Sequence, residues 1–162
     1  MGKRLYVVDW WVWVLVLGLI ISFVKSRRPI TIRSMYRITL LSSSVPYGYK
    51  DEWGGPDQYV IVKVDGKKVI RTSVVVNTNY VDDWSYHGDY SAEVVLGKVV
   101  KQGKRFWGSR IDVWLMDSDE WSSDDVIAHW MVEDPTKLEK LSTDNTWVRF
   151  KVKKLKEKEQ LK

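Results

Sequence analysis

The sequence predicts an all-β fold, an eight-stranded antiparallel β-sandwich preceded by one N-terminal transmembrane helix. Residues 5–24 form one apolar run, and from Pro29 onward short runs of β-branched and aromatic residues alternate with turn residues. The 162 residues suit one domain with an appendage. We therefore divide the chain into an anchor with a basic flank (1–28), a sandwich (29–153) and a basic tail (154–162).

The apolar run "LYVVDWWVWVLVLGLIISFV" carries Asp9 as its only charged residue. Twenty helical residues at about 1.5 Å each match the roughly 30 Å hydrocarbon core of a bilayer. Trp10, Trp11 and Trp13 gather at one end, as in an interfacial aromatic belt. The run therefore predicts a single-pass membrane anchor.

Two alternatives to an anchor are a secretory signal peptide and a buried core helix. A signal peptide has a shorter apolar run and ends in small residues, and "ISFVKSRRP" offers no such cleavage site. The positive-inside rule favours a cytoplasmic C-terminal domain, because more cations follow the run than precede it. The cations that follow are Lys25, Arg27, Arg28, Arg33 and Arg37.

The sandwich is predicted from short segments in order along the chain. We expect strands at 30–41, 58–64, 69–76, 92–96, 110–116, 126–132 and 146–153, with an eighth unassigned. The sequence "DGKK" between the second and third segments predicts a tight hairpin turn. The expected core residues are Val64, Ile70, Val74, Val76, Val95, Ile111, Val113, Leu115 and Val148.

Composition narrows the function. The chain has no cysteine, which excludes disulfides and thiolate metal sites. Residues 51–147 hold 11 Lys and Arg against 18 Asp and Glu, so the positive surplus lies at the two ends, where it suits a membrane surface better than nucleic acid.

His87 and His129 are expected to be structural or surface residues. Because no nucleotide loop and no nucleophile with a base are present, we expect a protein that is not an enzyme.

Two acidic loops predict a site for a hard cation. "MDSDEWSSDDVIA" places four aspartates in a short stretch, and Asp51 and Asp57 flank a Gly-Gly turn. Calcium takes about 6–8 oxygen ligands from carboxylates, carbonyls and water. Clustered carboxylates repel one another unless a cation lies between them.

The same segments resemble the C2 domain, the calcium- and phospholipid-binding β-sandwich. "DEWGGPDQYVIVKVDGKK" resembles the family's first calcium loop, and "IDVWLMDSDEWSSDDVIA" resembles its third. "RTSVVVNTNYVDDW" resembles the strand and Asn-Thr turn that lead to a tryptophan. The resemblance covers roughly residues 30–153. Gln58 and Ala128 depart from it, since the family prefers proline and glycine there.

The resemblance implies a calcium site and a lipid-binding surface. The implied Ca²⁺ ligands are Asp51, Asp57, Asp117, Asp119, Asp125 and Ser122, with Asp124 beside them. The expected lipid contacts are Trp53, Trp121, Lys63, Lys67, Lys68 and Arg71. In the alternative interpretation, the acidic loops are ordinary solvated turns, Trp53 covers the end of the sandwich and the cations form a solvated face.

The leading hypothesis is a membrane-anchored C2-like module that binds calcium through two Asp-rich loops and docks on phospholipid membrane or a partner. The alternative is a structural subunit of a larger membrane or envelope assembly, viral assemblies included. There the sandwich would serve protein–protein contacts, with calcium structural or absent. A third option is an extracellular module with permanently bound calcium.

Overall fold

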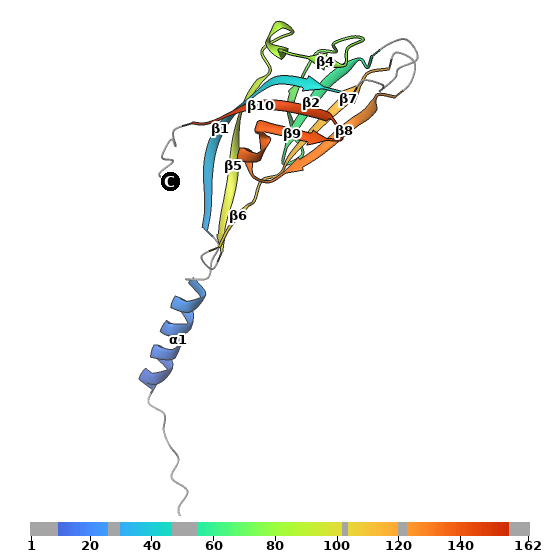
Figure 1. The fold of residues 1–162 in the computed structure, drawn as a ribbon. Coiled ribbons are helices and arrows are strands. Elements are labelled where there is room, and N and C mark those ends of the chain that lie inside the picture. The colour runs from blue at the N-terminus through green and yellow to red at the C-terminus, as the bar shows by residue number, and fades with distance from the viewer. Residues whose placement is uncertain (1–9, 26–29, 47–54, 102–103, 120–122, 156–162) are drawn as a thin grey trace, which may run out of the picture.

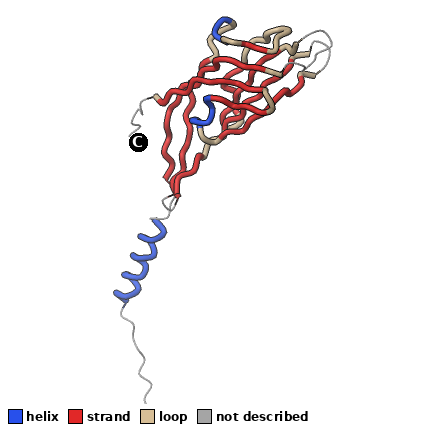
Figure 2. Tube along the Cα trace, in the orientation of Figure 1, coloured by secondary structure: helices blue, strands red, loops and turns tan. Residues whose placement is uncertain are grey.

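The computed structural model describes residues 10–25, 30–46, 55–101, 104–119 and 123–155. Two antiparallel sheets pack face to face, and one helix, α1 (Trp10–Lys25), precedes them (Figures 1 and 2). The predicted antiparallel sandwich is confirmed. The described residues form ten strands rather than the expected eight, because short strands at 80–81, 104–107 and 140–143 escaped prediction.

The larger sheet has the order β6-β5-β1-β10-β9, with β4 also paired to β1. Its strands are β1 (Ile30–Ser44), β4 (Tyr80–Val81), β5 (Ser91–Lys101), β6 (Lys104–Trp107), β9 (Lys140–Thr143) and β10 (Thr146–Lys154). The long strand β1 pairs with β5 along one edge and with β10 along the other. It is therefore the central strand of this sheet. Its pairing with β10 shifts register between Leu40 and Ser42.

The smaller sheet has the order β3-β2-β7-β8. Its strands are β2 (Gln58–Val64), β3 (Lys67–Arg71), β7 (Ile111–Asp117) and β8 (Asp125–Val132). Strands β2 and β3 are joined by Asp65 and Gly66, which have φ angles of 49° and 79°. Such left-handed backbone at both turn residues is typical of a two-residue hairpin, as "DGKK" predicts. Two short 3₁₀ helices, η1 (Trp84–Tyr86) and η2 (Pro135–Glu139), complete the domain.

Alternation along each strand divides core from surface. In β7, Ile111, Val113 and Leu115 have no exposed surface and face the other sheet, where Ile38 and Leu96 are also fully buried. Six of the nine expected core residues are buried: Val64, Ile70, Ile111, Val113, Leu115 and Val148.

Three expected core residues are exposed, and each has a local reason. Val74 and Val76 are 41% and 68% exposed because strand β3 ends at Arg71 and the segment beyond it bonds to β2 through Thr72 and Val75. Val95 is 50% exposed because its neighbours Val94 and Leu96 take the inward positions of β5.

The predicted single-pass membrane anchor is wrong. Helix α1 begins at Trp10 and contains 16 residues, about 24 Å of helix at 1.5 Å per residue. Within the described parts of the chain, no helix is long and apolar enough to cross a membrane. The predicted cytoplasmic orientation of the C-terminal domain depended on that span and is withdrawn with it.

Trp84 anchors one corner of the sandwich. Its indole is fully buried in the core, and its Nε1–H donates to Ser43 Oγ at 3.1 Å. Asp83 caps η1 by accepting the Ser85 N–H. The side-chain hydrogen bond from Ser85, followed by this backbone bond, lowers the pKa of Asp83. The cap fixes the direction in which Trp84 enters the core.

We expect Trp84→Ala to lower the free energy of unfolding by about 3–5 kcal/mol, because it removes a large core side chain and leaves a cavity. Denaturant-induced unfolding measures this change. Tyr86→Ala in the same 3₁₀ helix is the matched control, because Tyr86 is 82% exposed. The control should stay within about 0.5 kcal/mol of the wild type. Equal effects of the two substitutions would contradict the assigned packing.

Candidate functional site

One end of the sandwich collects the described parts of both acidic loops. We call it the loop end, and it comprises residues 55–57, 77–79, 117–119 and 123–125. Strand β2 starts there and β7 finishes there, because the two are antiparallel with Gln58 paired to Asp117. Strand β8 leaves from the same place, with Asp125 paired to Asp117. Antiparallel partners lie about 4.5–5.5 Å apart at Cα, so the two loops are spatial neighbours.

A carboxylate joins the two loops directly. The backbone N–H of Asp57 donates to Asp117 Oδ1 at 2.7 Å, and the N–H of Ser118 donates to the Asp57 carbonyl at 3.0 Å. Asp117 is 5% exposed, whereas Asp57 is half-buried. Two aspartates separated by 60 residues therefore meet at one point.

Asn77 adds a third segment that the sequence interpretation did not assign to the site. Its N–H donates to Asp57 Oδ1 at 2.7 Å, and its side-chain Oδ1 accepts the Gly55 N–H at 2.7 Å. Asn77 adopts left-handed backbone, with a φ of 56°, as asparagine tolerates better than most residues. The Asn-Thr turn in "NTNYVDDW" was the sequence feature that could have identified Asn77 as part of the site. The sequence interpretation used this turn only as a likeness to the C2 family.

Gly55 shows how closely these segments approach one another. A Cβ at this position would lie 3.0 Å from Asn79 Oδ1 and 3.2 Å from the Thr78 backbone. Glycine is therefore required by the neighbouring turn.

Gln58 explains one departure from the C2 pattern. Its backbone N–H and carbonyl both bond to Val75, at 2.9 and 2.8 Å, and a proline here could not donate the first bond. Its fully buried side chain accepts from Ser43 Oγ at 3.0 Å and donates to the Thr78 carbonyl. Because Ser43 also accepts from Trp84, the polar chain runs from the core to the turn behind Asp57.

The structure places only part of the predicted calcium ligand set. Asp57 and Asp117 are brought together, Asp125 lies opposite Asp117 on an exposed position, and Asp119 follows β7 half-buried. Within residues that the structure describes, no group of three or more His, Asp or Glu side chains is arranged to hold a metal. The predicted ligands Asp51 and Ser122 and the predicted lipid contacts Trp53 and Trp121 lie outside the described residues.

Asp124, which the sequence places beside the predicted ligands, bonds to a strand of the smaller sheet. The Tyr59 hydroxyl on β2 donates to Asp124 Oδ2, so the third loop is tied back to the smaller sheet. Burial, followed by this hydrogen bond, raises the pKa of Tyr59 to about 12. The Arg71 guanidinium lies 5.3 Å from the centre of the Tyr59 ring and covers it.

The four predicted lipid-binding cations lie on or beside the outer face of the smaller sheet. Lys67 and Lys68 are exposed just after the hairpin turn, and Arg71 is exposed at the end of β3. Lys63 is half-buried, with its ammonium 4.5 Å above the Trp114 ring. We call these four residues the hairpin patch. Lys63 and Arg71 are held against aromatic rings, whereas Lys67 and Lys68 project from the hairpin.

A charged cluster supports the same face. The Arg110 guanidinium donates to both carboxylate oxygens of Asp112, and His129 Nε2 lies 3.1 Å from Asp112 Oδ1. Burial alone would raise the pKa of Asp112, but the hydrogen bonds from Arg110 and His129 lower it below its ordinary value. His129 also stacks on Trp114 with ring centres 4.5 Å apart. His129 therefore has a structural role, as the sequence predicts.

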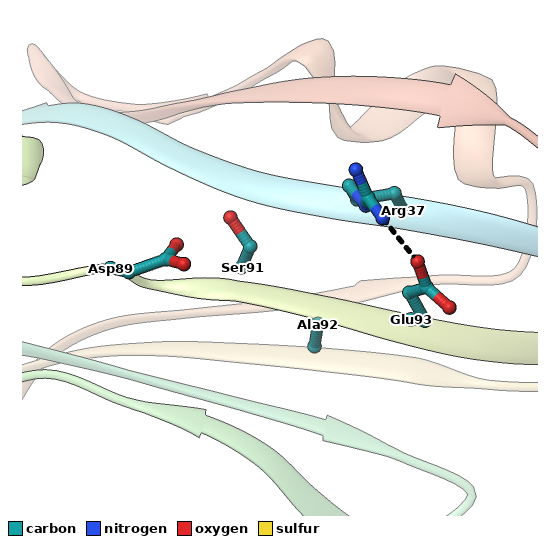
Figure 3. Close-up of a pocket in the computed structure, with 5 residues that line it drawn as sticks. All are labelled: Arg37, Asp89, Ser91, Ala92 and Glu93. Carbon is teal, nitrogen blue, oxygen red and sulfur yellow. Dashed lines mark hydrogen bonds and ion pairs between the residues drawn. The ribbon is translucent and has the colours of Figure 1, made fainter.

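A cavity of about 310 Å³ opens elsewhere, on the larger sheet. Its lining comprises Arg37, Asp89, Ser91, Ala92 and Glu93, and Arg37 forms an ion pair with Glu93 across β1 and β5 (Figure 3). No residue of the loop end lines this cavity. The cavity is therefore separate from the candidate calcium site.

Solved structures share this arrangement of strands. The chain aligns over 81% of its length with the whole of a C2 domain from plant extended synaptotagmin 1, with a TM-score of 0.51 and 13% identity. It also aligns over 78% of its length with human GIVD cytosolic phospholipase A2 in complex with methyl γ-linolenyl fluorophosphonate, with a TM-score of 0.56 and 13% identity. The aligned part is 18% of the phospholipase chain. The fold is therefore C2-like.

Comparisons at the level of sequence identify no related protein. No family model matches the chain, and no curated protein sequence matches it.

The burial of Tyr59 and its hydrogen bond to Asp124 should appear in the pH dependence of stability. The folded-state pKa of Tyr59 lies above its ordinary value of 10.0, so the folded form keeps the proton that the unfolded form loses. This stabilisation is complete below pH 10 and is lost as the pH rises toward about 12.

We expect the unfolding free energy of the wild type to fall across this interval more steeply than that of Tyr59→Phe, as measured by urea unfolding at each pH. Tyr80→Phe is the control, because Tyr80 is 54% exposed. Parallel curves for the wild type and Tyr59→Phe would contradict the assignment.

Proposed function

We propose that this C2-like sandwich is a calcium-binding module that docks on anionic phospholipid. Calcium binds at the loop end, and the hairpin patch meets the lipid. The chain thus has a binding role rather than a catalytic one.

The observation that carries the proposal is the hydrogen bond from the Asp57 backbone to Asp117 Oδ1. It holds the ends of two Asp-containing loops together. A backbone N–H that donates to a carboxylate also fixes the direction of that carboxylate. Asp57 and Asp117 are thus held side by side by the fold itself, which lowers the ordering cost of binding.

The chemistry of the donors suits calcium. Asp57, Asp117, Asp119 and Asp125 supply hard carboxylate oxygens, and loop carbonyls supply more. Together with the predicted ligands Asp51 and Ser122, these residues would hold the ion. Calcium contributes two positive charges, which offset the repulsion among the carboxylates and make the loop end less negative.

Lipid docking follows from the change in charge. Without a cation, the acidic loop end repels an anionic bilayer. Lys67 and Lys68 lie at the other end of β2, about 20 Å from the loop end at 3.3 Å per residue. Both regions therefore reach the headgroups only when the smaller sheet lies along the bilayer, an orientation that neutralised loops permit, and each exposed lysine then contributes about 1 kcal/mol. The C2-like fold shared with the extended synaptotagmin domain supports this role. The chain aligns with only 18% of the phospholipase chain, which supports a binding module rather than the whole enzyme.

We expect calcium to raise the thermal unfolding midpoint of the wild type and to leave that of Asp57→Asn/Asp117→Asn unchanged. The double variant loses two charges but keeps Oδ1 at both positions, so the bonds from Asn77 and Asp57 persist and the fold is preserved. At 100 times the dissociation constant, bound calcium stabilises the wild type by about 2.7 kcal/mol. Calorimetric titration with calcium gives the affinity directly.

Glu133→Gln is the matched control for charge. Glu133 is exposed just beyond the opposite end of β8, so its variant should respond to calcium as the wild type does. A wild-type protein without any calcium response would sink the proposal and favour the structural-subunit alternative.

A second test concerns the hairpin patch. With calcium present, we expect Lys67→Gln/Lys68→Gln to weaken binding to phosphatidylserine-containing vesicles by roughly 30-fold, from about 1 kcal/mol per cation. Vesicle co-sedimentation over a range of lipid concentrations measures the affinity. Lys137→Gln in η2 is the control, because Lys137 is exposed but outside the patch. Unchanged binding of the double variant would remove the patch from the docking surface.

A further inference from the structure

A row of cations crosses the outer face of the larger sheet, which the proposed function does not use. Arg149, Lys151 and Lys153 alternate along β10, and all three are exposed. The residues between them, Phe150 and Val152, take the inward positions. The three cations therefore lie on one face, with neighbours about 6.6–6.8 Å apart along the strand. We call them the β10 row.

Cations on both neighbouring strands face this row directly. Arg37 of β1 is paired with Lys153, and Lys140 of β9 is paired with Arg149. Like charges directly opposite each other across antiparallel strands are destabilising. Among the described residues, no ion pair joins Arg149, Lys151 or Lys153 to a carboxylate. The sheet therefore concentrates positive charge at a cost in stability that folding alone does not explain.

Aromatic residues lie at one end of the row. Trp147 precedes Arg149 by two residues on the same strand and is half-buried. Tyr80, 54% exposed, meets Trp147 edge-on with ring centres 5.8 Å apart, and the Lys140 ammonium lies 5.8 Å from the Trp147 ring. Tryptophan and tyrosine beside lysines and arginines are typical of surfaces that meet the lipid interface.

The cavity on β5 marks the other border of the cationic face. There the Arg37 guanidinium is paired with Glu93, and Asp89 lies farther along the same edge (Figure 3). Positive charge is thus partly offset on the β5 side and uncompensated toward β10 and β9. The uncompensated area runs from Lys153 to Lys140 across the β10 row.

We infer that the β10 row, with Lys140, docks on an anionic phospholipid bilayer without calcium. Charge complementarity identifies the partner, because a sheet of anionic headgroups would neutralise both like-charge pairs at once. The shape of the surface favours a bilayer over single-stranded nucleic acid, since the cations stand on an open sheet face, whereas strand-binding proteins track the backbone in a groove.

This surface is distinct from the hairpin patch. The two sheets of a sandwich turn their outer faces in opposite directions. The β10 row belongs to the larger sheet, and the hairpin patch to the smaller one. One flat bilayer therefore cannot lie against both.

The test measures binding of the full chain to two kinds of vesicle in the presence of a calcium chelator. One kind is pure phosphatidylcholine, and the other contains one phosphatidylserine in four lipids. The ratio of the two affinities isolates the electrostatic part of binding. We expect Arg149→Gln/Lys151→Gln/Lys153→Gln to lower this ratio on the order of 100-fold.

The matched control is Lys63→Gln/Lys67→Gln/Lys68→Gln, which removes the same charge from the other sheet. Under chelation its ratio should equal that of the wild type, because laying the smaller sheet on the bilayer would also bring the unneutralised carboxylates of the loop end to the anionic headgroups. Added calcium then tests the proposed function separately. The increase in vesicle binding that calcium causes should disappear in the control triple variant and persist in the β10 variant.

The β10 variant should keep or raise the thermal unfolding midpoint, because two like-charge pairs are relieved. An unchanged vesicle ratio for this variant would overturn the inference and leave the row a solvated face. Equal binding of the wild type to both kinds of vesicle under chelation would do the same. Tighter binding to a single-stranded oligonucleotide than to vesicles would assign the row to nucleic acid instead.

Discussion

The carboxylate of Asp117 accepts the backbone N–H of Asp57, and the carboxylate of Asp57 accepts the backbone N–H of Asn77. These two bonds join three chain segments at one end of the sandwich. Each bond is charge-assisted, and Asp117 is almost fully buried, so water competes little for it. The two contacts fix where these three segments meet.

Behind these carboxylates, a neutral polar chain supports the same segments from the core. It runs from the Trp84 indole through Ser43 and the Gln58 amide to the Thr78 carbonyl. No buried side-chain nitrogen or oxygen in the described part of the chain lacks a hydrogen-bond partner. A fully satisfied buried network favours one arrangement, because a shifted loop would leave a buried polar group unpaired. The packing of the core and the geometry of the loops therefore depend on each other.

Several features followed from the sequence because their causes are local. The two-residue turn at Asp65 and Gly66 needs left-handed backbone, which those residue types tolerate. Alternation in β7 correctly placed Ile111, Val113 and Leu115 inside. The antiparallel sandwich was predicted in the same way, from runs of strand-forming residues between turns.

Tertiary structure decided the rest, because the deciding partners are far apart along the chain. Asp57 meets Asp117 across 60 residues, and Tyr59 meets Asp124 across 65. Alternation shows that Val95 and its neighbours face opposite sides, but only the position of the other sheet determines which side is the core. Likewise, the hydropathy pattern marked a run of 20 residues, whereas the described helix has 16. The sequence by itself determines which segments tend to form strands and which residues tend to be buried. Long-range packing determines which of these residues contact one another.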